Sequence, residues 1–305
     1  MTTNIQNILA GEYVEPIPRI AAVCHDIRAR HPGRVLGFIY YGSSLRDMED
    51  PDNMLDFYVI VDSYRKTHKN PIRMVLNKAF PPAVYYHEME HQDGIKTTCK
   101  YSIMSLNGFE RRCSPSAFLS VTWGRFSQPC VVLYPESEDV YNRIMAARET
   151  AIRRMAAQTA PLFDGRATSP KFWARGFLQS YRTELRPESS EGRAEEIVLR
   201  YEDRYAAIMT ALYGAPDAEG YYTLPAGSKR AMKTKWFFRR LLGKPANAIR
   251  VLCSAATFEG GLPYVQHKLE KHSGVRIPVT KSQIKHPVLW SPVLFYKYWR
   301  KGAFR

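Results

Sequence analysis

Residues 34–62 constrain the fold more than any other part of the chain, because two apolar segments flank a short turn and an acidic loop. Residues 35–41 predict a buried strand that ends at Gly42-Ser43-Ser44. Residues 54–62 predict a second buried strand, which carries Asp56 in its interior. A carboxylate inside a strand is costly unless a cation or hydrogen-bond donors compensate its charge. The sequence therefore predicts a charged partner for Asp56.

A strand, a Gly-Ser turn and an acidic strand in this order are typical of nucleotidyltransferase active sites. The backbone N–H groups of Gly42, Ser43 and Ser44 would bind a triphosphate. Asp56 would hold the Mg²⁺ ion that neutralises it. Such sites usually place a second carboxylate two residues further along the strand, where this chain has Tyr58. A doubly buried strand whose aspartate caps a loop is the alternative that these residues leave open.

The next segments offer a second carboxylate and a lysine. Residues 83–90 and 95–105 predict two strands joined by a turn at residues 92–94. A mixed sheet could bring Glu88 beside Asp56, although an exposed hairpin with ordinary charged residues is the commoner arrangement. Lys100 is either a phosphate contact or an edge lysine that prevents strand pairing.

The charge of the chain is unevenly distributed. The 305 residues carry a net charge of +15, and residues 228–305 contain 17 Lys or Arg against two acids. The whole excess of positive charge therefore lies in the last quarter of the sequence. A basic region beside a neutral body predicts an anionic partner, either lipid or nucleic acid.

Composition sets the broad class of the protein. A chain of this length with 45% hydrophobic residues can bury a substantial core and form two domains. Its five cysteines show no CxxC spacing, which predicts reduced thiols in a cytosolic setting and no zinc site. No secretory signal pattern opens the sequence, and no apolar run approaches the length of a membrane span.

The second half predicts mainly helices. They are expected over residues 136–160, 170–185, 191–213, 228–242, 245–258 and 262–272. In the first half, helices are expected over residues 18–30 and 63–80. We expect an α+β protein in three parts. Residues 1–135 would form a catalytic domain around a nucleotidyltransferase-like mixed sheet, and residues 136–227 a helical domain that completes the active-site cleft. Residues 228–305 would form a basic, aromatic-rich region for membrane association.

The segment 285–301 is aromatic and apolar with basic flanks, and it is too short to cross a bilayer as a helix. Trp and Tyr beside Lys and Arg suit the headgroup interface of an anionic membrane. A nucleic acid would accept the same mixture through phosphate neutralisation and base stacking. Packing of the segment onto its own domain is a third interpretation.

Several segments in the same order carry a family resemblance. They are Tyr41-Gly42-Ser43, Leu55-Asp56-Phe57 with Val61-Asp62, Val84-Tyr85-Tyr86, residues 99–104, residues 124–130 and residues 180–186. Together they resemble the mitochondrial-type phosphatidate cytidylyltransferases, also called the translocator assembly and maintenance family, and in particular its bacterial-type members. The resemblance covers about residues 34 to 200. The chain departs from the family pattern at Gln128, Thr183 and Glu184.

The resemblance implies that CTP and phosphatidic acid react to CDP-diacylglycerol and diphosphate with Mg²⁺ as cofactor. For this reaction we expect the catalytic residues Asp56, Glu88 and Lys100. Asp56 would bind the metal, with Glu88 as the weaker choice for a second carboxylate. We expect Gly42, Ser43, Ser44 and Arg125 to bind the nucleotide, and Tyr181 and Arg186 to contact the lipid phosphate. We expect a cytoplasmic, peripheral protein on the inner face of the cell membrane, held there by its C-terminal region.

Two other classes of function stay open. The basic last quarter of the chain would allow nucleotidyl transfer to a nucleic acid, although the overall pattern disfavours a nucleic-acid partner. Tyr58, at the position of the usual second carboxylate, allows a non-catalytic scaffold on a membrane surface.

Overall fold

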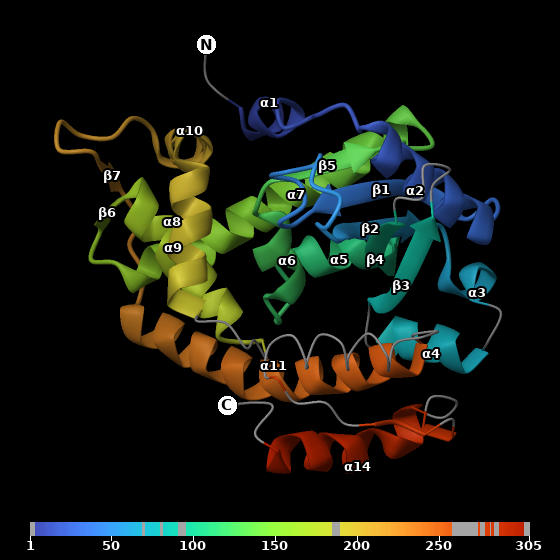
Figure 1. Ribbon diagram of the computed structural model, residues 1–305. Helices are drawn as coiled ribbons and strands as arrows, with labels where there is room; N and C mark the ends of the chain where they lie inside the picture. The colour runs from blue at the N-terminus through green and yellow to red at the C-terminus, as the bar shows by residue number, and fades with distance from the viewer. Residues whose placement is uncertain are drawn as a thin grey trace. The chain divides into compact units, whose positions relative to one another are not determined.

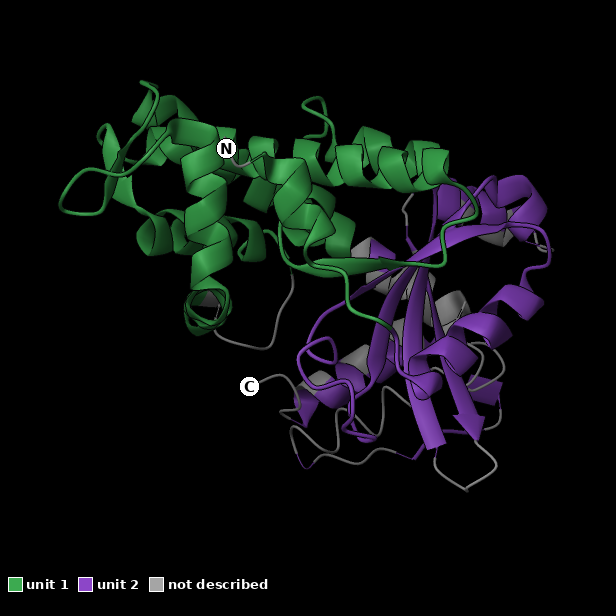
Figure 2. Cartoon of the chain, turned by 90° about the horizontal axis from the view of Figure 1, so that it is seen from above, with its two compact units in different colours: residues 1–15, 106–247 green, residues 16–105, 248–305 purple. Residues whose placement is uncertain are grey.

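The structure is a computed structural model of an α+β protein (Figure 1), and it describes residues 4–68, 71–79, 82–90, 96–184, 190–257, 274, 278–280, 282–283 and 287–301. The chain forms two compact units (Figure 2). Unit 1 comprises residues 1–15 and 106–247, and unit 2 comprises residues 16–105 and 248–305. The domain boundaries expected near residues 135 and 227 both lie within unit 1.

Unit 2 is built on a mixed sheet. Its strands are β1 (Val35–Tyr41), β2 (Leu55–Val61), β3 (Ala83–Glu90) and β4 (Lys96–Ser105), in the spatial order β3-β4-β2-β1. Strands β2 and β4 run parallel, whereas β1 with β2 and β3 with β4 are antiparallel. The predicted mixed sheet and the predicted positions of these strands are confirmed. The turn expected at residues 92–94 lies outside the described residues.

Helix α2 (Pro18–Arg30) covers one face of this sheet (Figure 1), and its bounds match the helix expected from the sequence. The helix begins at a proline, which suits the first turn, and its apolar residues recur at three- and four-residue spacing. Arg28 lies over the ring of Phe38 on β1, and His87 on β3 contacts the carboxylate of Asp26 at 2.7 Å. Because side chains alternate along a strand, Asp56 points to the opposite face.

Unit 1 is mainly helical. Its elements are α1 (Ile5–Ala10), α5 (Leu106–Cys113), α6 (Val121–Phe126), β5 (Cys130–Leu133), α7 (Glu138–Thr159), η1 (Ala160–Leu162), β6 (Arg166–Thr168), α8 (Ser169–Tyr181), α9 (Ser190–Arg200), α10 (Glu202–Tyr213) and β7 (Tyr221–Thr223). Helix α11 (Lys229–Thr257) begins in unit 1 and ends in unit 2. Strands β6 and β7 form a separate antiparallel pair.

Four expected helices have different limits in the structure. The single helix expected over 191–213 is divided at Tyr201, whose backbone angles are not helical. The two helices expected on either side of Lys244 are one, because α11 continues through Pro245. The helix expected over residues 63–80 is present as α3 (Tyr64–Thr67) and α4 (Pro71–Ala79). The helix expected over 262–272 lies outside the described residues.

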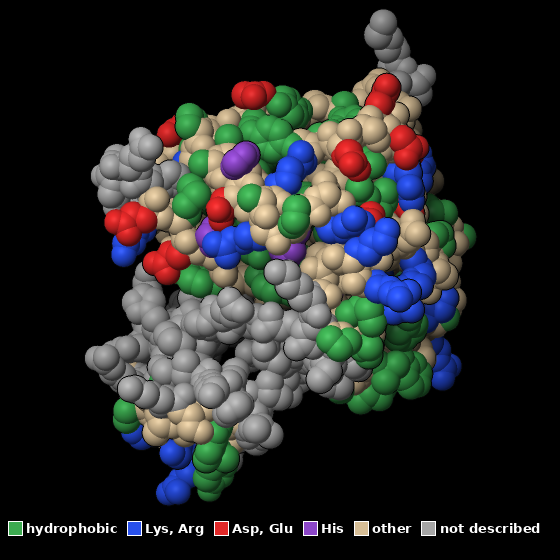
Figure 3. Space-filling model, turned by 90° about the vertical axis from the view of Figure 1, so that its right-hand side faces the viewer, with side chains coloured by type: hydrophobic (Ala, Val, Ile, Leu, Met, Phe, Trp, Pro, Cys, Tyr) green, Lys and Arg blue, Asp and Glu red, His purple; other side chains and the backbone are tan. Residues whose placement is uncertain are grey.

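Residues of the C-terminal segment form α14 (Pro287–Arg300). Among the residues that the structure describes, no helix combines the length and the apolar character needed to cross a membrane. The face drawn in Figure 3 carries acidic and basic side chains interspersed over its upper part, in agreement with the balanced charge of most of the sequence.

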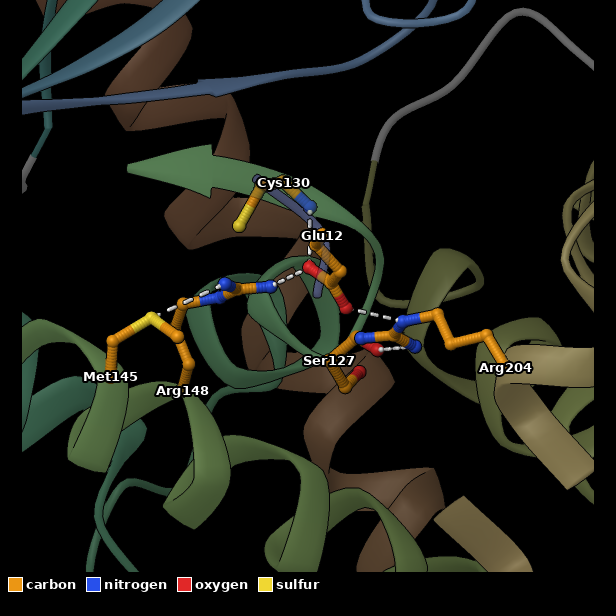
Figure 4. A network of polar contacts seen from close by, with 6 residues as sticks. All are labelled: Glu12, Ser127, Cys130, Met145, Arg148 and Arg204. Carbon is orange, nitrogen blue, oxygen red and sulfur yellow. Dashed lines mark hydrogen bonds and ion pairs between the residues drawn. The ribbon is translucent and has the colours of Figure 1, made fainter. Parts of the chain in front are cut away.

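The N-terminal segment of unit 1 is held by the carboxylate of Glu12 (Figure 4). One carboxylate oxygen accepts hydrogen bonds from Arg148 and from the Cys130 backbone, and the other accepts one from Arg204 Nε at 2.6 Å. Arg204 also donates to the Ser127 carbonyl. Arg148 is only 1% exposed, so its charge depends on Glu12 for compensation.

Burial alone would raise the pKa of Glu12, but the charges of Arg204 and Arg148 outweigh it and lower the pKa below its ordinary value of 4.5. A carboxyl group whose pKa is lower in the folded protein stabilises the fold above its unfolded-state pKa. This stabilisation is lost as the pH falls through the folded-state pKa.

We predict that Glu12→Gln lowers the free energy of unfolding by about 3–5 kcal/mol near neutral pH, because two buried guanidinium groups lose their counter-charge. Urea denaturation measures the change. The difference from wild type should shrink as the pH falls from 4.5 through the lower folded-state pKa of Glu12, because the unfolded wild-type chain binds the proton first.

Glu196→Gln is the matched control, because Glu196 also pairs with two arginines, Arg193 and Arg200, but is 43% exposed. Its effect should stay within about 1 kcal/mol. Equal effects of the two substitutions would show that burial of the Glu12 network does not matter for stability.

Candidate functional site

The predicted site in unit 2 begins where β1 ends. Gly42 adopts a φ of +95°, a conformation that other residues rarely take. A side-chain carbon added to Gly42 would lie 3.1 Å from Asp56 Oδ2, so the carboxylate lies directly against this glycine. Gly42 and Ser43 are exposed, whereas Ser44 is completely buried. The structure therefore brings the predicted phosphate-binding turn and the predicted metal ligand together.

Lys100 is the charged partner that the sequence predicted for Asp56. The two residues lie directly opposite each other on the parallel strands β2 and β4, and Lys100 Nζ is 3.5 Å from Asp56 Oδ1. Strand β4 lies between β3 and β2. The interpretation of Lys100 as an edge lysine is therefore wrong, because β4 is an interior strand. Its side chain is one-third exposed and faces the same side of the sheet as Asp56.

Glu88 lies on the same face but not beside Asp56. Across the sheet, Tyr86 is opposite Lys100, and Glu88 is opposite Thr98. Glu88 is thus displaced from Asp56 by two strands across the sheet, which is about 10 Å. It is also displaced by two residues along the strand direction, which is about 7 Å. Glu88 is exposed. One metal ion bound directly by Asp56 would lie closer to Lys100 than to this second carboxylate.

The Asp56 carboxylate has free capacity for a ligand. Its Oδ1 atom is buried and accepts no hydrogen bond among the described residues, and its contact with Lys100 is an ion pair. In the described part of the chain, no group of three or more His, Cys, Asp or Glu side chains is arranged to hold a metal. Mg²⁺ usually takes most of its ligands from water and from bound phosphates.

The other predicted site residues belong to unit 1. Arg125, on α6, forms an ion pair with Glu184 at 3.9 Å, and the Glu184 side chain is 8% exposed. Tyr181 is 4% exposed and its ring stacks on Phe177 within α8. Arg186 lies outside the described residues. The roles predicted for these three residues stay predictions.

Sequence reasoning passed over Arg19, in the first turn of α2. Its Nη2 atom donates to the Met48 carbonyl at 2.7 Å, within the loop that joins β1 to β2. The sequence offered only one signal, the position of this arginine at the start of a predicted helix.

No known protein-family model matches the sequence, and no curated protein matches it. The family resemblance of residues 34–200 thus stays a prediction that the motif residues alone carry.

We predict that Gly42→Ala destabilises the protein more than Gly33→Ala does. Both glycines have positive φ angles, so each alanine should cost about 1–2 kcal/mol in backbone strain. Nothing lies within 4 Å of the added carbon at Gly33, whereas at Gly42 it would crowd Asp56 and cost about 1–3 kcal/mol more. Thermal and urea unfolding measure both variants, and equal losses would refute close contact between Gly42 and Asp56.

Proposed function

We propose that this protein is a Mg²⁺-dependent cytidylyltransferase that converts CTP and phosphatidic acid to CDP-diacylglycerol and diphosphate at a membrane surface. One observation carries the proposal: Asp56 lies against the positive-φ Gly42 turn, with Lys100 beside it on the neighbouring interior strand. The nucleotidyltransferase-like character of the sheet is part of the same proposal. The choice of cytidine and of a lipid acceptor rests on the family resemblance.

The chain's own residues suit a reaction that needs positioning and charge neutralisation. The phosphate of phosphatidic acid is already a nucleophile, so its attack on the α-phosphorus of CTP needs no strong general base. Gly42 and Ser43 are exposed, so their backbone N–H groups would hold the triphosphate, and Lys100 would contact a phosphate oxygen. Fixed donors and charges of this kind lower the barrier most when they act on the charge that develops during transfer.

The residues fit Mg²⁺ together with a nucleotide. Mg²⁺ commonly binds one or two carboxylates and completes its shell with water and substrate phosphates. Asp56 would supply the first carboxylate, and Glu88 remains the weaker choice for a second. When bound, Mg²⁺ would neutralise charge on the phosphates, while Lys100 balances the carboxylate in its absence.

The roles of the other predicted site residues rest on the family resemblance, and the role of the C-terminal region rests on its composition. Arg125 would contact the nucleotide, and Tyr181 and Arg186 the lipid phosphate. Because the acceptor is a membrane lipid, the basic C-terminal region would hold the enzyme on an anionic membrane surface. The Tyr296 and Trp290 side chains of α14 are exposed, as an interfacial helix requires.

We predict that Asp56→Asn abolishes transfer of label from CTP to a lipid-extractable product in mixed micelles of phosphatidic acid with Mg²⁺. The amide keeps the shape of the side chain but loses the charge that binds the metal. Asp62→Asn is the matched control, because Asp62 follows the same strand but pairs with Arg34 at 2.7 Å. It should retain near-normal activity.

A folded Asp56→Asn variant with normal turnover would contradict the metal-ligand role. Absence of transfer by the wild type, with CTP still bound, would direct the search to another acceptor. Protection of the protein by polynucleotides without liposome binding would favour a nucleic-acid acceptor.

We also predict that truncation before Lys285 weakens sedimentation with anionic liposomes, and that the wild-type binding falls as salt is added. Neutral phosphatidylcholine liposomes serve as the control lipid. Unchanged sedimentation of the truncated protein would exclude the C-terminal segment as the membrane contact.

A further inference from the structure

Helix α11 carries a contiguous apolar surface on its solvent side. Its members are Phe237, Phe238, Leu241 and Leu242, named here the α11 patch, and each is between 48% and 56% exposed. Their spacing sets them on one side of the helix, and the rings of Phe237 and Phe238 lie 5.6 Å apart. Single exposed apolar side chains are common, but a contiguous group of large ones marks an interaction surface.

The opposite side of α11 is anchored in unit 1. Met232, Trp236 and Arg239 recur at four- and three-residue spacing and are buried. Trp236 Nε1 donates to the Gln158 carbonyl at 3.0 Å. Arg239 Nε donates to the Phe118 carbonyl at 2.9 Å. Because these contacts fix which side of the helix faces the protein, the α11 patch is held toward solvent.

Positive charge borders the α11 patch. The part of α11 in unit 1 contains no acid, and its basic residues are Lys229, Arg230, Lys233, Lys235, Arg239, Arg240 and Lys244. Lys233 and Lys244 lie next to Phe237 on one side of the patch, four residues before it and seven after it. Lys235 lies on the other side, seven residues before Leu242. These three lysines are exposed and form no ion pair among the described residues.

This combination favours an anionic lipid surface as the partner. Lysines beside a strip of Phe and Leu are typical of interfacial helices, which insert their apolar side chains below the lipid headgroups. A nucleic acid would need cations across the contact, and leucine has no aromatic face on which a base could stack. In a symmetric dimer through the patch, the basic flanks of two copies would oppose each other. An anionic lipid surface compensates both the apolar side chains and the charges.

We propose that the α11 patch is a membrane contact of unit 1, separate from the segment 285–301, and that it inserts into an anionic leaflet. The segment 285–301 belongs to unit 2, so the two contacts lie in different units. The choice of a membrane as partner rests on the proposed function, whose acceptor is a lipid. The surface itself rests on the exposed side chains and their basic flanks.

Sedimentation of the full chain with vesicles of phosphatidylcholine and phosphatidylglycerol tests the patch, because phosphatidylglycerol is anionic but is not the proposed acceptor. Phe237→Gln and Leu241→Gln should each weaken binding about tenfold, since each removes a large apolar side chain from the contact. Lys233→Gln and Lys244→Gln should each weaken it about fivefold and reduce its dependence on salt. Melting temperatures should stay near that of the wild type, because all four side chains are exposed.

Leu199→Gln is the matched control. Leu199 is also an exposed leucine on a helix of unit 1, but it belongs to α9. This variant should bind the vesicles as the wild type does.

Insertion of the patch has a direct readout in fluorescence. Phe238→Trp should add emission that lipids with brominated acyl chains quench, because the new side chain would lie among those chains. Leu199→Trp should add emission that the same lipids do not quench.

The inference is overturned if wild-type protein binds no anionic vesicles, or if the Phe237 and Leu241 variants bind them normally. It is also overturned if brominated lipids do not quench the emission added by Phe238→Trp. Loss of a dimer in Leu241→Gln, with vesicle binding unchanged, would reject the membrane contact and assign the patch to an interface between two copies.

The proposed reaction can fail or hold independently of this surface. Label transfer to a water-soluble, short-chain phosphatidic acid by a wild type that binds no vesicles would reject the α11 patch and leave the reaction intact. Vesicle binding that depends on the patch, in a protein that transfers no label, would keep the surface and reject the reaction.

Discussion

The ion pair between Asp56 and Lys100 is the interaction on which the candidate site depends. It forms because β2 and β4 run parallel in a register that sets the two residues directly opposite each other. Both strands are interior to the sheet, so the backbone of each residue is held by strand pairing on both sides. Gly42 then lets the chain turn directly against the carboxylate, which places the proposed phosphate-binding turn next to a charged pair.

A second buried carboxylate organises unit 1. Glu12 comes from the first segment of the chain, yet its arginine partners are 136 and 192 residues away in sequence. Here two cations surround one carboxylate, and both of its oxygens accept hydrogen bonds within the protein. At Asp56 one carboxylate oxygen is buried and accepts no hydrogen bond among the described residues, although Lys100 lies beside it. This contrast separates a stabilising network from a site with capacity for a ligand.

Much of unit 2 could be predicted from local sequence. Apolar runs mark β1 and β2, the Gly42 turn marks the end of β1, and a proline marks the start of α2. These signals are local, because burial and backbone geometry act over a few residues. The partner of Asp56 could be expected but not identified, since strand order depends on contacts between distant segments. The interior position of Lys100 followed only from the placement of β4 beside β2.

Other features had no local signal. Pro245 normally predicts a helix end, yet α11 continues through it, and the residues around Tyr201 gave no sign that the helix is interrupted there. The partners of Glu12 and the hydrogen bond from Arg19 to the Met48 carbonyl depend on tertiary packing. Glu88 was expected beside Asp56 on the basis of a shared face, but the register sets it two strands away.

The central claim is that Asp56 holds a metal–nucleotide complex against the Gly42 turn. Electron paramagnetic resonance of the Mn²⁺–CTP complex tests it most directly, because the Mn²⁺ spectrum reports its own ligands. The account predicts that wild-type protein changes this spectrum and that folded Asp56→Asn protein leaves it as in buffer. The same change with both proteins, or no change with the wild type, would contradict the claim.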